Sequence, residues 1–172
     1  MIGRVPAPPL TPLAAAVLHV PRPERALAIA CGEGDAALFL AREFPSARVR
    51  GVDPSEALIH AAVDRVGLDP EGRIAFKVGA SRRLPYPDAF FDLAVGAVGR
   101  LDPTAAARVL RPGGHLIVAP ARRPGLRGRL ELALLRRRLL IHDFSTLSLP
   151  EAAERNFLVA RLAGSGGTAR SI

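Results

Sequence analysis

Four residues have the types and the spacing of a nucleotide-binding site. Cys31, Gly32 and Gly34 end a short apolar run in RALAIACGEGD (residues 25–35), and Asp53 ends a second apolar run 19 residues after Gly34. Glycines let the backbone approach a ligand closely, and the N-terminus of a following helix offers unpaired N–H groups. A carboxylate at the end of the next strand can accept both hydroxyls of a ribose. The spacing therefore favours a nucleotide-like ligand.

Other interpretations of this stretch have to be weighed. A lipoprotein cleavage site needs an uninterrupted apolar stretch before the cysteine, whereas the charged sequence RPER directly precedes ALAIAC. Gly32, Gly34 and Ala37 match the loose pattern G-x-G-x-x-G/A of nicotinamide- and flavin-binding folds. That match is weak by itself, so a dinucleotide site stays open at this point.

The elements that would position these residues follow from the alternation of short apolar runs and helical patterns. Ser55 is a suitable N-cap and Gly67 a suitable stop for one of the helices. The alternation predicts an α/β fold with a parallel sheet that is covered on both faces. We expect strands at 26–31, 47–53, 73–78, 90–96 and 115–120, a turn at 111–114 (RPGG), and helices at 35–44 and 54–67.

The sequence changes character after Pro120, with seven arginines between positions 122 and 138. We expect a helix from about 127 to 142, a further helical stretch at 147–156, and an antiparallel strand pair from 157–164 and 168–172. The arginine-rich helix could be a lid or docking face for an acidic, phosphorylated or membrane-bound partner. An ordinary edge helix, whose arginine stems cover apolar surface, is the favoured interpretation because charged faces usually need no partner.

Length and composition bound the class of protein. A chain of 172 residues that is 49% hydrophobic fits one domain, with a core at 26–120 and the remaining elements at 121–172. The net charge of +8 comes from arginine, since Lys77 is the only lysine, and such a bias also arises from base composition, so nucleic-acid binding is not expected. One cysteine, four scattered histidines and no long apolar run predict a cytoplasmic protein without disulfides, metal site or membrane span.

Four blocks of the sequence follow one another in a recognisable order: ALAIACGEG (26–34), VRGVDPSEALIHAA (49–62), LPYPDAFFDLAVG (84–96) and VLRPGGHLIVAP (109–120). The pair LPYPDAFFD and RVLRPGG is much more specific than any glycine pattern. Together the blocks resemble the class I S-adenosylmethionine-dependent methyltransferases, nearest the type 11 or ubiquinone/menaquinone-biosynthesis-like group. The resemblance implies a three-layer, Rossmann-like α/β sandwich with a mostly parallel seven-stranded sheet and an antiparallel last strand. It also implies S-adenosylmethionine as the cofactor.

The resemblance also implies roles for individual residues. Asp53 would hold the ribose hydroxyls, and we expect Asp53→Ala to weaken adenosyl-ligand binding with thermal stability nearly unchanged. Asp92 belongs to a motif but is expected to support the fold. The other implied contacts are Ala30, Cys31, Gly32 and Gly34 along the methionine and ribose, Pro54 and Ser55 beside the adenosine, Ala80 and Ser81 at the adenine, and Gly96 beneath the sulfonium.

Two acids of the family pattern are replaced. In hLDhGCGxG the acid corresponds to Ala28 and the first glycine to Ala30, and the acid that follows the third strand corresponds to Ala80. If each charge-assisted hydrogen bond contributes about 1.5 to 3 kcal/mol, their joint loss weakens cofactor binding by about 10² to 10⁴, unless Glu33 or Asp35 substitutes.

Methyl transfer needs an acceptor held close and aligned in a dry pocket, and no obligatory catalytic residue follows. His115 and His142 are candidate bases only because histidine titrates near neutral pH. The sequence favours an S-adenosylmethionine-dependent methyltransferase that acts on a small molecule. A methyltransferase-like binding or regulatory module without catalysis is the alternative, motivated by Ala28, Ala80 and the short segment 97–109. A nicotinamide-dependent oxidoreductase would rest on the glycine pattern and Asp53 alone.

Overall fold

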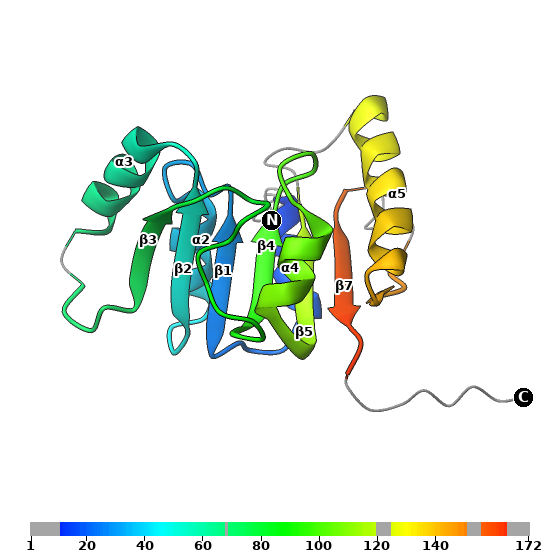
Figure 1. Cartoon of the computed structure of the whole chain (residues 1–172), viewed down its shortest axis with the longest axis horizontal. Helices are drawn as coiled ribbons and strands as arrows, with labels where there is room; N and C mark the ends of the chain where they lie inside the picture. Colours follow the sequence, from blue (N-terminus) through cyan, green and yellow to red (C-terminus); the bar gives the residue numbers. More distant parts are fainter. Residues whose placement is uncertain (1–10, 68, 120–124, 151–155, 165–172) are drawn as a thin grey trace, which may run out of the picture.

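The computed structural model describes residues 11–67, 69–119, 125–150 and 156–164. Seven strands form one sheet in the order β3-β2-β1-β4-β5-β7-β6 (Figure 1). The strands are β1 (Arg25–Ile29), β2 (Arg48–Asp53), β3 (Ile74–Val78), β4 (Phe91–Gly96), β5 (Leu110–Val118), β6 (Phe144–Thr146) and β7 (Leu158–Leu162). The helices are α1 (Pro12–Ala16), α2 (Asp35–Glu43), α3 (Glu56–Val66), α4 (Pro103–Val109) and α5 (Leu126–Ile141), with a 3-10 turn η1 (Val17–His19).

The sheet has the predicted mixed topology. Strands β1 to β5 run parallel, and β7 lies antiparallel between β5 and β6. The carboxyl ends of the parallel strands therefore meet at one edge, where open α/β sheets bind their ligands. This confirms the three-layer α/β sandwich with a seven-stranded sheet.

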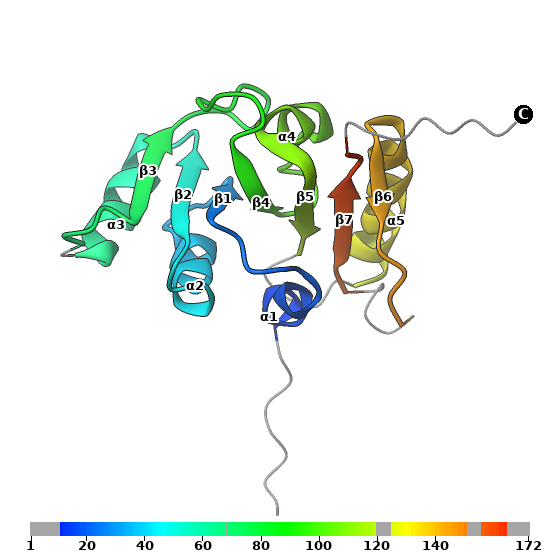
Figure 2. The ribbon, with the colours of Figure 1, turned by 90° about the horizontal axis from the view of Figure 1, so that it is seen from below.

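Both faces of the central strands are buried, as a parallel sheet requires. On one face, Ala26 and Ala28 of β1 belong to an apolar cluster that includes residues of α1, α2 and α3. On the other, Leu27 and Ile29 belong to a cluster with residues of α4 and α5. Seen from below, α1 and α2 lie on one side of the sheet and α4 on the other (Figure 2).

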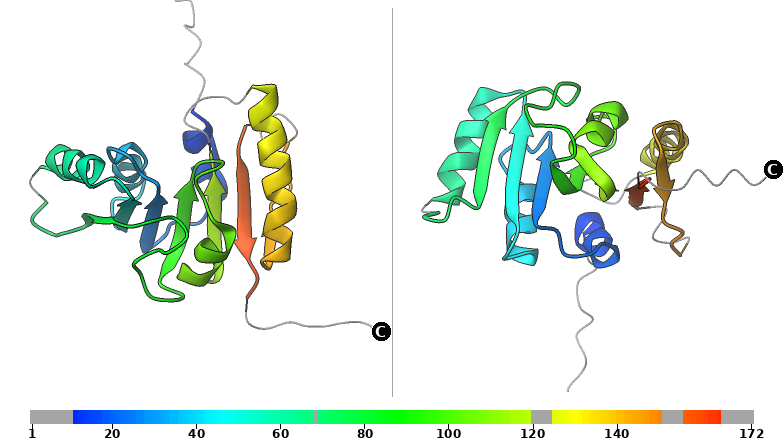
Figure 3. Two further views of the ribbon diagram at one scale, coloured as in Figure 1. Left: turned by 45° about the horizontal axis from the view of Figure 1, so that its top comes forward. Right: turned by 60° about the horizontal axis from the view of Figure 1, so that its bottom comes forward.

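Helix α5 stands beside β7 and β6 at one end of the sheet (Figure 3). Leu132, Leu135 and Leu139 are buried against these strands. Helix α5 thus lies at the edge of the sheet, as predicted, but its arginine stems do not cover the aliphatic side chains on its opposite side. Five of these are 53% to 86% exposed: Leu126, Leu130, Leu134, Leu140 and Ile141. None of the described helices is long and apolar enough to cross a membrane.

Some predicted elements differ from the structure. Residues 111–114 do not form a turn before the strand but lie within β5, where a register shift and the left-handed Gly113 accommodate them. Residues 147–150 are not helical, and residues 151–155 and 168–172 lie outside the described part of the chain. The antiparallel partners of β7 are instead β5 and the unpredicted short strand β6.

Helices α1 and α4 are also absent from the prediction, although each start carries a recognisable signal. Thr11 caps α1 by accepting from the Ala14 N–H, and Asp102 caps α4 by accepting from the Ala105 N–H. Proline occupies the next position in both helices, as it commonly does at the first helical residue. The dipeptides Thr-Pro and Asp-Pro were therefore the signals that sequence reasoning missed.

Candidate functional site

In the loop between β1 and α2, every second residue from position 30 to 34 has a left-handed backbone conformation. Ala30, Gly32 and Gly34 have φ angles of 52°, 56° and 87°. The Cys31 N–H donates to the Val52 carbonyl at 3.0 Å, and the Gly34 N–H donates to the Cys31 carbonyl at 3.0 Å. Glycine adopts this conformation without strain, whereas alanine does so at a cost. The loop therefore depends on its two glycines and carries strain at Ala30.

Asp53 fixes this loop from the adjacent strand. One carboxylate oxygen accepts from the Gly32 N–H at 2.9 Å, and the other accepts from the Ser55 N–H at 3.0 Å. The side chain is buried, with only 1% of the residue exposed. Each carboxylate oxygen has a second acceptor position, and the contact of Asp53 with the ribose hydroxyls stays a prediction. Asp53 thus has a structural role that the sequence did not predict, and unchanged stability of Asp53→Ala is no longer expected.

Phe76 of β3 packs beneath the same loop. A Cβ atom added to Gly34 would lie 3.0 Å from the Phe76 ring and 3.2 Å from the Ala62 Cβ. A Cβ atom added to Gly51 would lie only 2.3 Å from that ring and 3.0 Å from the Cys31 Sγ. The small residues at these positions make room for the ring, so the shape of the loop depends on three strands.

A cavity of about 510 Å³ opens at the carboxyl ends of β1 and β4, and we call it the loop cavity. A Cβ atom added to Gly32 would meet nothing within 4 Å, so the backbone there is open to a ligand. Four of the predicted cofactor contacts line the cavity: Ala30, Cys31, Gly32 and Gly96. Its other walls were not predicted and include Thr11 and Leu13 near α1, Phe39 of α2, and Arg100 after β4.

The remaining predicted contacts lie around the cavity but do not line it. Ser81 borders a second hollow, of about 360 Å³, beside α4 and α5. Gly34 belongs to the loop but does not border the cavity, and a Cβ atom added to it would lie against the Phe76 ring. Four others are placed at the ends of β2 and β3 without bordering the loop cavity: Asp53, Pro54, Ser55 and Ala80.

Glu33 and Asp35 could each replace an acid that is absent at positions 28 and 80, and the structure shows that their surroundings differ. Asp35 forms an ion pair with Arg65 of α3 at 2.7 Å, and the same guanidinium donates to the Glu33 carbonyl at 2.8 Å. Arg65 thus neutralises Asp35 and holds the outer side of the loop. Both acids border the cavity, but the Glu33 carboxylate has no partner among the described residues. Glu33 is therefore the better substitute, while Ala28 is buried in the apolar layer.

The titratable groups predicted as possible bases lie elsewhere. His115 of β5 borders a hollow at the amino ends of β1 and β4, where Asp92 accepts from the Arg25 N–H at 2.8 Å and pairs with Arg111 at 2.8 Å. His142 directly follows α5. Within the loop cavity, burial and then the Asp53 charge raise the pKa of the Cys31 thiol to about 11. This thiol stays protonated at neutral pH and is no nucleophile.

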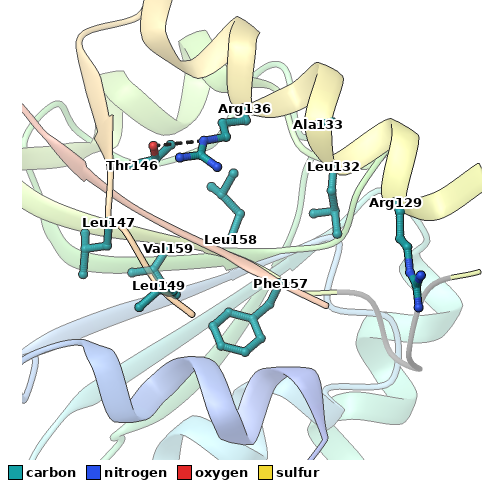
Figure 4. A pocket seen from close by; sticks show the side chains of 10 residues that line it. All are labelled: Arg129, Leu132, Ala133, Arg136, Thr146, Leu147, Leu149, Phe157, Leu158 and Val159. Carbon is teal, nitrogen blue, oxygen red and sulfur yellow. Dashed lines mark hydrogen bonds between the residues drawn. The ribbon is translucent and has the colours of Figure 1, made fainter. Parts of the chain in front are cut away.

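A further hollow of about 270 Å³ lies between α5 and the strands β6 and β7 (Figure 4). Its walls are mostly apolar, with Leu132 and Phe157 among them, and Arg136 donates to the Thr146 hydroxyl at 3.2 Å along one side. It carries no group suited to acid–base or nucleophilic chemistry among its lining residues. The loop cavity is therefore the candidate active site.

Comparison with known proteins agrees with this location. A family model described as "Methyltransferase domain" matches residues 26–114, which include the loop, Asp53 and the end of β4. The chain belongs to this family. Its members of class I use S-adenosylmethionine, so the cofactor is S-adenosylmethionine.

Relatives and solved structures support the assignment. The chain is 36% identical over 103 residues to a ubiquinone/menaquinone biosynthesis C-methyltransferase of Geobacter sulfurreducens, covering 55% of this chain and 40% of that protein. It is 37% identical over 116 residues to a 27-O-demethylrifamycin SV methyltransferase of Amycolatopsis mediterranei, covering 62% and 42%. The chain thus spans less than half the length of these curated relatives.

Structural neighbours share the fold at low sequence identity. An S-adenosylmethionine-dependent methyltransferase from Mesorhizobium loti superposes with a TM-score of 0.61 at 20% identity, covering 86% of this chain and 95% of that one. The [4+2]-cyclase SpnF superposes with a TM-score of 0.62 at 22% identity, covering 82% and 76%. Because a fold hosts more than one chemistry, these neighbours establish the architecture and not the reaction.

Proposed function

We propose that this chain binds S-adenosylmethionine in the loop cavity and transfers its methyl group to a small-molecule acceptor. The observation that carries the proposal is the open backbone at Gly32 beside a cavity of about 510 Å³ at the carboxyl ends of the strands. Cavities of this size suit a nucleoside-sized ligand. By their names, the two curated relatives described above are a C-methyltransferase of ubiquinone/menaquinone biosynthesis and a methyltransferase of 27-O-demethylrifamycin SV, which supports a small-molecule acceptor.

The chain's own residues would bind and orient the two reactants. The cofactor supplies a methyl group on a positively charged sulfur, a carbon already activated for displacement. The backbone at Gly32 would contact the cofactor, and the unpaired Glu33 carboxylate is suited to its ammonium group. Phe39 and Leu13 would exclude water from the cavity. Catalysis then depends on alignment in a dry site more than on a dedicated base.

The test is a binding experiment with a matched pair of glycine variants. Gly32→Asn introduces a residue that tolerates a left-handed backbone conformation, and the asparagine side chain would occupy part of the cavity. Gly72→Asn is the control, because Gly72 also has a left-handed φ, of 59°, and open space around it, but lies outside the cavity. Calorimetric titration with S-adenosylhomocysteine should show binding by the parent protein, at least about tenfold weaker binding by Gly32→Asn, and unchanged binding by Gly72→Asn.

Absence of binding by the folded parent protein at millimolar ligand would contradict the proposal. A module without catalysis would instead bind the ligand but transfer no labelled methyl group to any acceptor in an extract of small molecules. The alanines at positions 28 and 80 motivate that second outcome.

A further inference from the structure

Three arginines from separate parts of the chain border one hollow beside the loop cavity. The hollow has a volume of about 360 Å³, and we call it the arginine hollow. Arg82 comes from the segment after β3, Arg100 from the segment after β4, and Arg138 from α5. Arg100 also borders the loop cavity, so the two spaces adjoin at this side chain.

The two acids that border the arginine hollow, Asp102 and Glu131, form no ion pair with these arginines. Asp102 accepts from the Ala105 N–H at 2.9 Å and so caps α4. Glu131 pairs with Arg127 of its own helix, at 3.4 Å. Among the described residues, none of the three guanidinium groups at the hollow has a hydrogen-bond or ion-pair partner. Three arginines and two acids border the hollow, so its lining has a net positive charge and its three guanidinium groups can still pair with an anion.

Elsewhere, arginines that organise the fold are paired. Arg65 holds Asp35, and Arg108 holds Asp88 together with the Leu84 and Tyr86 carbonyls. Arg111 pairs with Asp92. Arg82, Arg100 and Arg138 are all exposed, so their guanidinium groups are accessible to an anion from solution.

We propose that the arginine hollow binds an anionic group, a carboxylate or a phosphate, of the methyl acceptor. Planar guanidinium groups bind either anion with two parallel hydrogen bonds. Leu101, Leu134 and Leu135 add an apolar wall, which suits the carbon frame of an organic anion better than a free inorganic ion. The proposal rests on the proposed function, since the adjoining loop cavity would present the methyl group.

Three probes of matched shape test the charge requirement. Benzoate carries a carboxylate, phenyl phosphate carries a phosphate, and benzamide is a neutral analogue of benzoate. We expect nuclear magnetic resonance titration of the full chain to give at least about tenfold tighter binding of one of the two anions than of benzamide. The affinity should fall as salt is added. The preferred anion distinguishes a carboxylate acceptor from a phosphorylated one.

Two sets of variants locate the binding. Arg82→Gln combined with Arg138→Gln removes two of the charges at the hollow while it leaves Arg100 and the loop cavity intact. Arg42→Gln, in the last turn of α2 and outside both spaces, is the control. The double variant should bind the preferred anion at least about fivefold more weakly, and the control should bind it as the parent does.

Equal binding of benzoate, phenyl phosphate and benzamide would overturn the inference, as would equal anion affinity in the double variant and the parent. Titration of the same samples with S-adenosylhomocysteine separates this failure from failure of the proposed function. Adenosyl binding without anion binding refutes only the acceptor site. Anion binding without binding of S-adenosylhomocysteine refutes the methyltransferase proposal. It also refutes the role of the arginine hollow in binding a methyl acceptor, and shows only that the hollow binds anions.

Discussion

The carboxylate of Asp53 should raise the free energy of unfolding by several kcal/mol. Asp53→Ala removes the acceptor for two backbone N–H groups, those of Gly32 and Ser55, at a site that is 1% exposed. A hydrogen bond to a charged group contributes about 1.5 to 3 kcal/mol, so the loss of both costs about 3 to 6 kcal/mol. Asp53→Asn keeps one acceptor oxygen and turns an amide donor toward the other N–H, so it should cost about half as much.

Denaturant unfolding monitored by circular dichroism measures these costs. Asp102→Ala is a matched control, because Asp102 caps α4 through a single backbone N–H and its loss should cost about 1 kcal/mol. Asp64→Ala, at an exposed position of α3, should change stability by less than about 0.5 kcal/mol. If Asp53→Ala unfolds within about 1 kcal/mol of the parent protein, Asp53 does not hold the loop, and the hydrogen-bonding argument is wrong.

Three further predictions follow from single positions. Ala30→Gly should stabilise the protein by about 0.5 to 1 kcal/mol in the same unfolding assay, because glycine adopts a φ of 52° without strain. The control Ala28→Gly, on the buried strand β1, should destabilise the protein by about 1 to 2 kcal/mol. A change of the same sign in both variants would contradict the proposed backbone strain at Ala30. The Tyr86 hydroxyl is buried and has no hydrogen-bond partner in the described part of the chain, so Tyr86→Phe should raise the unfolding free energy by about 1 kcal/mol and a decrease would refute the argument. Burial and then Arg161 lower the pKa of His115 below its usual 6.5. As the pH falls, the unfolded chain therefore takes up the proton at this histidine first, so the contribution of His115 to the unfolding free energy should be complete above pH 6.5 and decrease below it. His115→Gln should reduce the dependence of the unfolding free energy on pH between 5 and 8. A variant whose unfolding free energy depends on pH as the parent's does would disprove the contribution of His115.

The parts of the fold that were predictable depend on local signals. Ser55 and Gly67 bound α3 as expected, because a side chain that caps an N-terminus and a left-handed residue at the C-terminus act within a few residues. The strands β1 and β4 were predictable because burial on both faces leaves a continuous apolar run. The order of these runs along the chain is enough to indicate the layers of the sandwich.

Features that depend on distant partners were not predictable. Strand β6 is three residues long and is defined by its pairing with β7. The sequence RPGG looks like a turn, but β4 pairs with β5 both before it, at Leu110, and after it, at His115, so β5 continues through it with a register shift. Thr11 joins the loop cavity from outside the motif region, because α1 packs on the same face as α2.

The sequence by itself determined the alternation of elements, the glycine loop at 30–35, the acid at position 53 and the loss of the acids at 28 and 80, because each is a matter of residue type and spacing. Only the tertiary structure decided what these groups contact. Asp53 binds the loop backbone, Asp35 pairs with Arg65, and three arginines from separate segments border one hollow. The physical reason is that burial, pairing and charge balance are properties of neighbours in space, which strand order and helix packing bring together.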